Sequence, residues 1–145
     1  MKRLLAVMAL SALLASAAFA ATQDFGAFTV DVLDGWTASQ EGPTAVIIKN
    51  DNTASLSITL AETDGASLGD LANAFVEEFK KTFTSVSAPE KDEDGDYSFS
   101  MVNGNGVESK ALITGDDSQY CLFVMTGIDA AGDEISAMLG SVKDK

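Results

Sequence analysis

Five carboxylates stand close together in residues 90–96, which read Glu-Lys-Asp-Glu-Asp-Gly-Asp, and four of them recur at every second position. Oxygen ligands supplied at short intervals by one loop are what Ca²⁺ prefers in proteins. Glu90, Asp92, Asp94 and Asp96 therefore form a candidate calcium loop.

The spacing of this segment departs from that of an EF-hand. Counted from Glu90, Gly95 falls at the sixth position, as an EF-hand requires, but Met101 stands at the twelfth, where a bidentate Glu is needed. No pair of flanking helices is expected on either side of the loop. We therefore favour a solvated hairpin loop over a low-affinity calcium site, and we assign no other metal ligand and no cofactor.

Histidine is absent from the sequence. This removes the commonest general base near neutral pH, and with it Ser-His-Asp catalysis, Cys-His catalysis and His-containing zinc sites within the chain. Acidic pairs occur at Asp116-Asp117 and Asp133-Glu134, but hydrolysis by two carboxyl groups needs them to face each other across a cleft. No catalytic residue is assigned, and a carboxylate-based hydrolase is the least favoured function.

Cys121 and Trp36 are each the only residue of their type in the sequence. Cys121 lies in the apolar run Tyr-Cys-Leu-Phe-Val-Met, so we expect a buried thiol, with a reactive or intermolecularly bonded thiol as the alternative. Trp36 opens a predicted strand and is expected to anchor the core. If it stood exposed beside Phe25, the two rings would instead form an interaction surface.

Residues 1–20 follow the three-part pattern of a secretory signal of bacterial type. Lys2 and Arg3 precede an apolar stretch, residues 4–14, and Ala18-Phe19-Ala20 matches the small-x-small cleavage rule. The apolar stretch is too short to cross a hydrocarbon layer of ~30 Å as a helix. We expect the general secretion route, cleavage after Ala20, and a periplasmic or extracellular single domain over residues 21–145.

Negative charge dominates the composition. The net charge is −13, and removal of Lys2 and Arg3 with the signal makes it −13 − 2 = −15. Such a field repels phosphate backbones and anionic lipid surfaces, so we expect neither nucleic-acid binding nor direct membrane insertion after cleavage. Cationic partners and metal ions remain compatible with it.

Hydrophobic periodicity predicts strands followed by a helix, then more strands and a second helix. The expected strands are 28–32, 36 to about 43, 45–49, 56–60, 86–90, 97–102, 107–114 and 119–126. The expected helices are 67–83, with Ser67 as N-cap and an ion pair between Glu77 and Lys81, and 132–143. Residues 22–26 are expected to be a loose leader. Without strand–helix–strand alternation, this order predicts an α+β domain whose mainly antiparallel sheet has about six to seven strands flanked by helices.

The order of these elements, with Asp34-Gly35-Trp36 after the first strand, resembles the Mog1/PsbP-like superfamily. In that group this segment commonly reads strand, Pro, one residue, Gly-Trp; Leu33 stands where the Pro would be. The resemblance covers about residues 25–143 and implies a curved antiparallel sheet between helices, an α/β/α sandwich. It also implies roles as accessory subunits, adaptors or secreted domains, mostly without catalysis and with no shared catalytic residues.

The expected function follows from these observations together. It is a secreted or periplasmic, non-enzymatic accessory domain that binds a protein partner in the cell envelope, through one face of its sheet or the loops beside Trp36. The alternative is a small-ligand or divalent-cation binding protein that uses a pocket between helix and sheet or the acidic loops.

Overall fold

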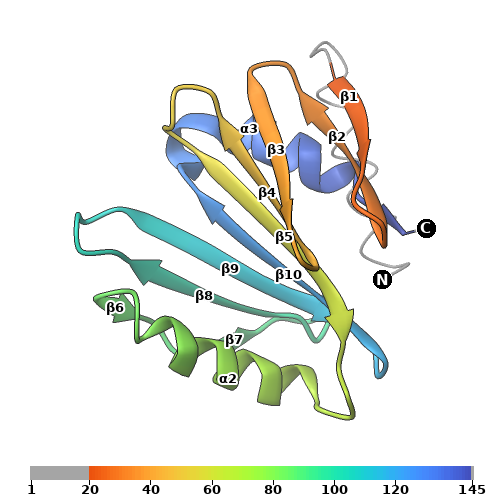
Figure 1. The fold of residues 1–145 in the computed structure, drawn as a ribbon. Helices are drawn as coiled ribbons and strands as arrows, with labels where there is room; N and C mark the ends of the chain where they lie inside the picture. The colour runs from red at the N-terminus through yellow and green to blue at the C-terminus, as the bar shows by residue number, and fades with distance from the viewer. Residues whose placement is uncertain (1–19, 145) are drawn as a thin grey trace.

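The computed structural model describes residues 20–144, and its largest element is an antiparallel sheet of eight strands (Figure 1). The strands follow the order β3-β4-β5-β10-β9-β8-β6, with β7 also paired to β8. Their bounds are Trp36–Glu41 for β3, Thr44–Lys49 for β4, Ser55–Glu62 for β5, Ser85–Val86 for β6, Glu90–Lys91 for β7, Tyr97–Val102 for β8, Glu108–Gly115 for β9 and Gln119–Thr126 for β10. The strand expected over 86–90 is thus two short pairings on either side of a gap.

A second sheet has three strands and is built from the two ends of the described chain. It contains β1 (Ala20–Asp24), β2 (Phe28–Leu33) and β11 (Lys143–Asp144), in the order β1-β2-β11. The expectation of a loose leader at residues 22–26 is wrong, because β1 pairs with β2 from Ala20 opposite Leu33 to Asp24 opposite Thr29. Pairing with β2 provides hydrogen-bond partners for the backbone N–H and C=O groups of β1, although the residue pattern of β1 did not predict a strand. Residues 1–19 of the predicted signal lie outside the described residues.

Two helices are present in residues 20–144; the first begins where it was predicted but ends at Phe79, four residues before the predicted end at residue 83. Helix α2 (Leu68–Phe79) starts after Ser67, whose hydroxyl accepts the N–H of Asp70 as expected for an N-cap. Its surface ion pairs link Glu77 to Lys80 and Glu78 to Lys81, so the expected partner of Glu77 was wrong by one residue. No helix in this part of the chain is both long and apolar enough to span a bilayer.

Helix α3 (Ile128–Gly140) begins and ends earlier than predicted. Gly127 has φ of 78°, which turns the chain out of β10 directly into the helix, and a kink at Ala131 realigns the axis. The chain leaves the helix at Ser141, so Val142, which was expected on the helix, instead leads into β11. Val142 remains a core residue there, at 2% exposure.

The two helices cover different halves of the sheet, on opposite faces. Helix α2 packs on β8 and β9 over a smaller core (Figure 1). Helix α3 and the small sheet enclose a larger core with β3, β4, β5 and β10 on the other face. This arrangement confirms the predicted α+β class, with a sheet larger than expected because the edge strands are short and weakly patterned.

We expect Gly127→Ala to lower the free energy of unfolding by about 1–3 kcal/mol, because φ of 78° disfavours a side chain. A Cβ at this position would also lie 2.3 Å from the carbonyl oxygen of Thr53. Gly104→Ala is the matched control, since a Cβ there meets nothing within 4 Å. Urea unfolding of the three proteins measures the difference, and equal losses in the two variants would contradict the close packing of β10 and α3 on the β4–β5 turn.

Candidate functional site

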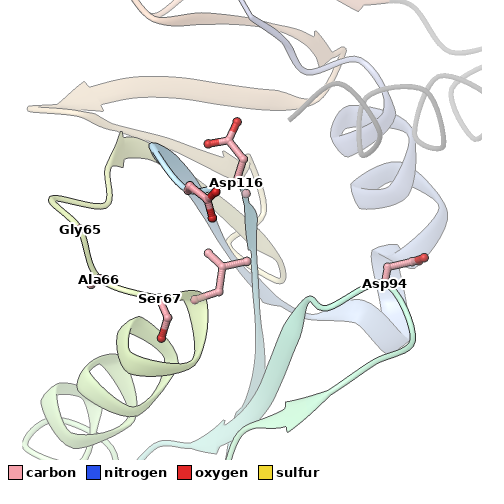
Figure 2. A pocket seen from close by; sticks show the side chains of 8 residues that line it. Gly65, Ala66, Ser67, Asp94 and Asp116 are labelled. Atoms are coloured by element: carbon pink, nitrogen blue, oxygen red, sulfur yellow. The ribbon is translucent and has the colours of Figure 1, made fainter.

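Three connections meet at one end of the sheet and enclose an open hollow of about 600 Å³ (Figure 2). They are the β5–α2 connection, the β7–β8 turn and the β9–β10 turn. We call this the acidic hollow; its lining residues are Gly65, Ala66, Ser67, Leu68, Asp94, Gly115, Asp116 and Asp117. Figure 2 shows Asp94 well apart from Asp116, so the carboxylates of the hollow do not converge on one point.

A second hollow of about 400 Å³ adjoins the acidic hollow and shares Gly65 and Asp117 with it. Its lining adds two more carboxylates, Glu62 and Asp64. No Lys or Arg lines either hollow. This end of the molecule therefore carries a strongly negative potential that attracts cationic groups.

The carboxylate of Asp116 is hydrogen-bonded within the turn in which it lies. One oxygen accepts the backbone N–H of Gln119 at 2.9 Å and of Ser118 at 2.8 Å, and the hydroxyl of Ser118 at 3.0 Å. These hydrogen bonds, led by the one from Gln119, lower the pKa of Asp116 to about 2. A carboxyl group held in its ionised form this way is a poor proton donor and serves the turn.

The same direction of shift is seen at two more carboxyl groups. The pKa of Asp51 is lowered by hydrogen bonds from Thr53, and the pKa of Glu134 by hydrogen bonds from Lys49 and Trp36. A two-carboxylate hydrolase requires one acid whose pKa is raised. The pKa values of Asp51, Asp116 and Glu134 are all lowered, which is the opposite of what such an acid needs.

The candidate calcium loop brings together three of its four predicted residues. Carboxylate oxygens of Asp92, Asp94 and Asp96 lie within 4.8 Å of one another, whereas Glu90 is in β7 and outside this group. One oxygen of Asp92 accepts the backbone N–H groups of Asp94 and Asp96, at 2.9 and 3.0 Å. The hydrogen bonds of Asp92 therefore explain part of this cluster as the support of a hairpin turn without a metal ion. Calcium binding stays a prediction.

Trp36 and Phe25 are both core residues, each 6% exposed. The indole N–H of Trp36 donates to Glu134 Oε2 at 2.6 Å, and Lys49 Nζ lies 2.8 Å from Glu134 Oε1. These contacts tie α3 to β3 and β4, which is the anchoring role expected for Trp36. An exposed aromatic platform, which the interaction-surface hypothesis requires, is not formed by these two rings.

Cys121 is fully buried in the larger core, as the apolar run predicted. Burial raises the pKa of its thiol to about 12. A thiol that stays protonated and has no access to solvent is unreactive toward oxidants and other thiols. The alternative of a reactive thiol therefore does not fit its surroundings.

One surface that the sequence analysis did not single out lies on β3, β4 and β5. The alternate residues of these strands fill the larger core, so the intervening ones point to the face on which α2 lies. Helix α2, however, packs on β8 and β9 and leaves this half open (Figure 1). We call it the uncovered face; it consists of Thr37, Ser39, Glu41, Thr44, Val46, Ile48, Ser55, Ser57 and Thr59.

The uncovered face is mostly hydroxyl-bearing, with a small apolar centre. Ile48 is 39% exposed and stands opposite Thr37 and Ser55, with Val46 one row along. The hydroxyls of Thr44 and Thr59 are 2.7 Å apart, and Glu41 ends the same row. The signal for this face was present in the sequence, in the strict alternation Ser-Leu-Ser-Ile-Thr-Leu from residue 55, but alternation alone does not say whether a helix covers the polar side.

Comparison with known proteins rests on the fold. No protein-family model matches the sequence, and no curated protein matches it significantly. The solution structure of cyanobacterial PsbP (CyanoP) from Synechocystis sp. PCC 6803 matches 88% of this chain and 94% of its own, with a TM-score of 0.52 and 12% identity. The chain has a PsbP-like fold. A crystal structure from Bacteroides thetaiotaomicron VPI-5482 aligns with 85% of this chain and 47% of its own, with a TM-score of 0.48 and 16% identity.

The PsbP-like fold agrees with the predicted α+β class and with the architecture that the resemblance implied. At 12% identity it carries the architecture and no residue roles. The site must therefore be argued from this chain's own side chains.

We expect the stability contributed by the β9–β10 turn to depend on pH through Asp116. Its native pKa of about 2 is below the usual 3.8, so the contribution is fully present above pH 3.8 and is lost as the pH falls through 2. Asp116→Asn should therefore be less stable than the natural protein well above pH 3.8, and the difference should shrink toward zero near pH 2.

Urea unfolding at the two pH values measures this difference. Asp117→Asn is the matched control, because it removes a charge from the same turn without removing the bonds that Asp116 accepts. A stability difference for Asp116→Asn that is independent of pH would contradict the assignment.

Proposed function

We propose that this protein is an extracytoplasmic, non-enzymatic accessory domain that docks a protein partner of the cell envelope through its uncovered face. The observation that carries the proposal is the open half of the sheet on β3, β4 and β5, which no described element covers. The PsbP-like fold supports an accessory role at a coarse level. The partner is a protein whose docking surface carries Lys or Arg.

The predicted signal supports the extracytoplasmic location. Cleavage after Ala20 would remove one residue of β1 and leave residues 21–24 paired with β2. Cleavage at that point is compatible with the fold, because the ladder that holds β1 continues to Asp24. Because the sequence lacks histidine, carboxyl groups are the main titratable groups. The largest pKa shift among them, at Asp116, arises from hydrogen bonds that close a turn, which suits a structural role and not a catalytic one.

The chemistry of the uncovered face suits a protein partner. A small apolar centre surrounded by hydroxyl groups resembles the core and rim of a protein–protein interface. Glu41 at the end of β3 is the charged member of the face. A partner with basic side chains opposite this carboxylate would be favoured, and the overall negative charge would speed its approach.

The decisive experiment places a photo-reactive side chain at Ile48 and, in a second protein, at Val107. Val107 is 43% exposed and lies several strands away across the sheet, so it controls for exposure and apolar character. We expect irradiation in the native host to give one discrete cross-linked species from position 48 and none from position 107.

Charge reversal tests the chemistry of the partner. Glu41→Lys should reduce the cross-linking yield at position 48 several-fold, because it places like charges opposite each other. Glu77→Lys on the exposed side of α2 is the control and should leave the yield unchanged. Cross-linking that is equal at the two positions, absent at 48, or insensitive to Glu41→Lys would overturn the proposal.

A second candidate function is divalent-cation or small-ligand binding at the acidic end. The observation in its favour is the approach of the Asp92, Asp94 and Asp96 carboxylates within 4.8 Å, beside a hollow of about 600 Å³. Calcium at a hundred times its dissociation constant would add about 2.7 kcal/mol to the free energy of unfolding. Asp94→Asn would abolish this gain.

The docking proposal makes the opposite prediction for the same titration. It expects millimolar calcium to leave the unfolding midpoint unchanged, both in the natural protein and in Asp94→Asn. Thermal unfolding with calcium, and with a panel of small ligands, separates the two functions without knowledge of the partner.

A further inference from the structure

The tip of the β8–β9 hairpin contains both Asn-Gly pairs of the sequence, Asn103-Gly104 and Asn105-Gly106. We propose that Asn105 is a site of spontaneous deamidation and that the turn protects Asn103, although each is followed by glycine. This modification is independent of the proposed docking function. It follows from a difference in hydrogen bonding: the Asn103 side chain accepts two backbone N–H groups, whereas the Asn105 side chain accepts none in the described part of the chain.

Deamidation of asparagine is an intramolecular acyl transfer that needs only water. The backbone nitrogen of the next residue attacks the side-chain Cγ and loses its proton, and the bond from Cγ to the side-chain nitrogen breaks, so that ammonia leaves. The resulting five-membered succinimide is opened by water at either carbonyl, which gives aspartate or isoaspartate. Glycine as the next residue favours the attack, because it has no side chain to obstruct the nitrogen.

Asn103 is held in an unreactive position by its own side chain. Its Oδ1 accepts the backbone N–H of Asn105 at 2.8 Å and of Val107 at 3.0 Å. Its backbone N–H donates to the carbonyl oxygen of Val107 at 3.0 Å, which anchors it at the end of the strand pairing. For Gly104 to reach Cγ of Asn103, both side-chain hydrogen bonds must break together.

Asn105 is not restrained in this way. Its side chain is exposed and makes no hydrogen bond to any residue in the described part of the chain. The nitrogen that must attack it, that of Gly106, is held by a single hydrogen bond to the carbonyl oxygen of Asn103, at 3.0 Å. Residues 104–107 are all exposed, so this bond opens by local fraying of the turn without loss of core packing.

The product changes the surface at this end of the hairpin. Either product adds one negative charge, and isoaspartate also lengthens the backbone of the turn by one carbon. Val107, two residues on, lines an open hollow of about 240 Å³ together with Lys110 and Ile128. Ageing of the protein outside the cell would thus alter the charge beside this hollow.

The test measures deamidation in the purified protein, residues 21–145, during incubation at mildly alkaline pH, where the backbone nitrogen loses its proton more readily. Peptide mapping by mass spectrometry locates the product, and enzymatic methylation of isoaspartate quantifies it. We expect about tenfold more product at Asn105 than at Asn103, since the difference is set by breaking one hydrogen bond more at Asn103 and by its anchoring in the strand pairing.

Variants assign the product to its residue. Asn105→Gln should remove the acidic species seen on isoelectric focusing, whereas Asn103→Asp, whose carboxylate can accept the same two N–H groups, should still acquire it. Asn103→Ala removes the side-chain clamp and should increase the rate at Asn105 several-fold.

Denaturation shows whether the fold causes the selectivity. In concentrated urea the turn is lost, so the two sites should react at similar rates. Equal conversion of the two sites in the folded protein, a preference for Asn103, or a preference for Asn105 that persists in urea would each overturn the proposal.

Discussion

Strand β10 joins the two halves of the molecule, because its alternate side chains belong to two different cores. Cys121 and Phe123 point into the larger core beneath α3, and Leu122 points into the smaller core beneath α2. Its neighbours β5 and β9 pair with it along almost its whole length. Burial of a side chain such as Phe123 is worth roughly 1.5–3 kcal/mol, so this strand contributes to the stability of both layers at once.

The offset of the two layers follows from this sharing. Each helix covers the strands on its own side of β10, and neither extends over the whole sheet. The polar side of β3, β4 and β5 is left open, which is the surface on which the proposed docking rests. On the covered side, Trp36, Glu134 and Lys49 fix α3 against the same strands, so the uncovered face is carried by a rigid support.

Several carboxylates in this protein accept backbone N–H groups and so stabilise the turns in which they lie. Asp116 closes the β9–β10 turn, and Asp92 closes the β7–β8 turn by accepting two backbone N–H groups. Side-chain amides do the same at Asn103. A chain with 22 acidic residues and no disulfide thus uses some of its charge to fix the connections between strands, and the remainder gives one end of the sheet its negative potential.

The sequence by itself determined the strands whose polar and apolar residues alternate, the capped start of α2, and the burial of Cys121 and Trp36, because each depends on local pattern or side-chain chemistry. It did not determine β1 and β11, since strands at the edge of a small sheet gain their pairing from residues far along the chain. The start of α3 depended likewise on the backbone of Gly127 against the β4–β5 turn. Only the tertiary structure decided which three carboxylates of the 90–96 loop come together, which of two identical Asn-Gly pairs is held, and which polar face stays open. Each of those depends on where neighbouring backbone groups and helices lie in space, which residue order along one chain segment does not specify.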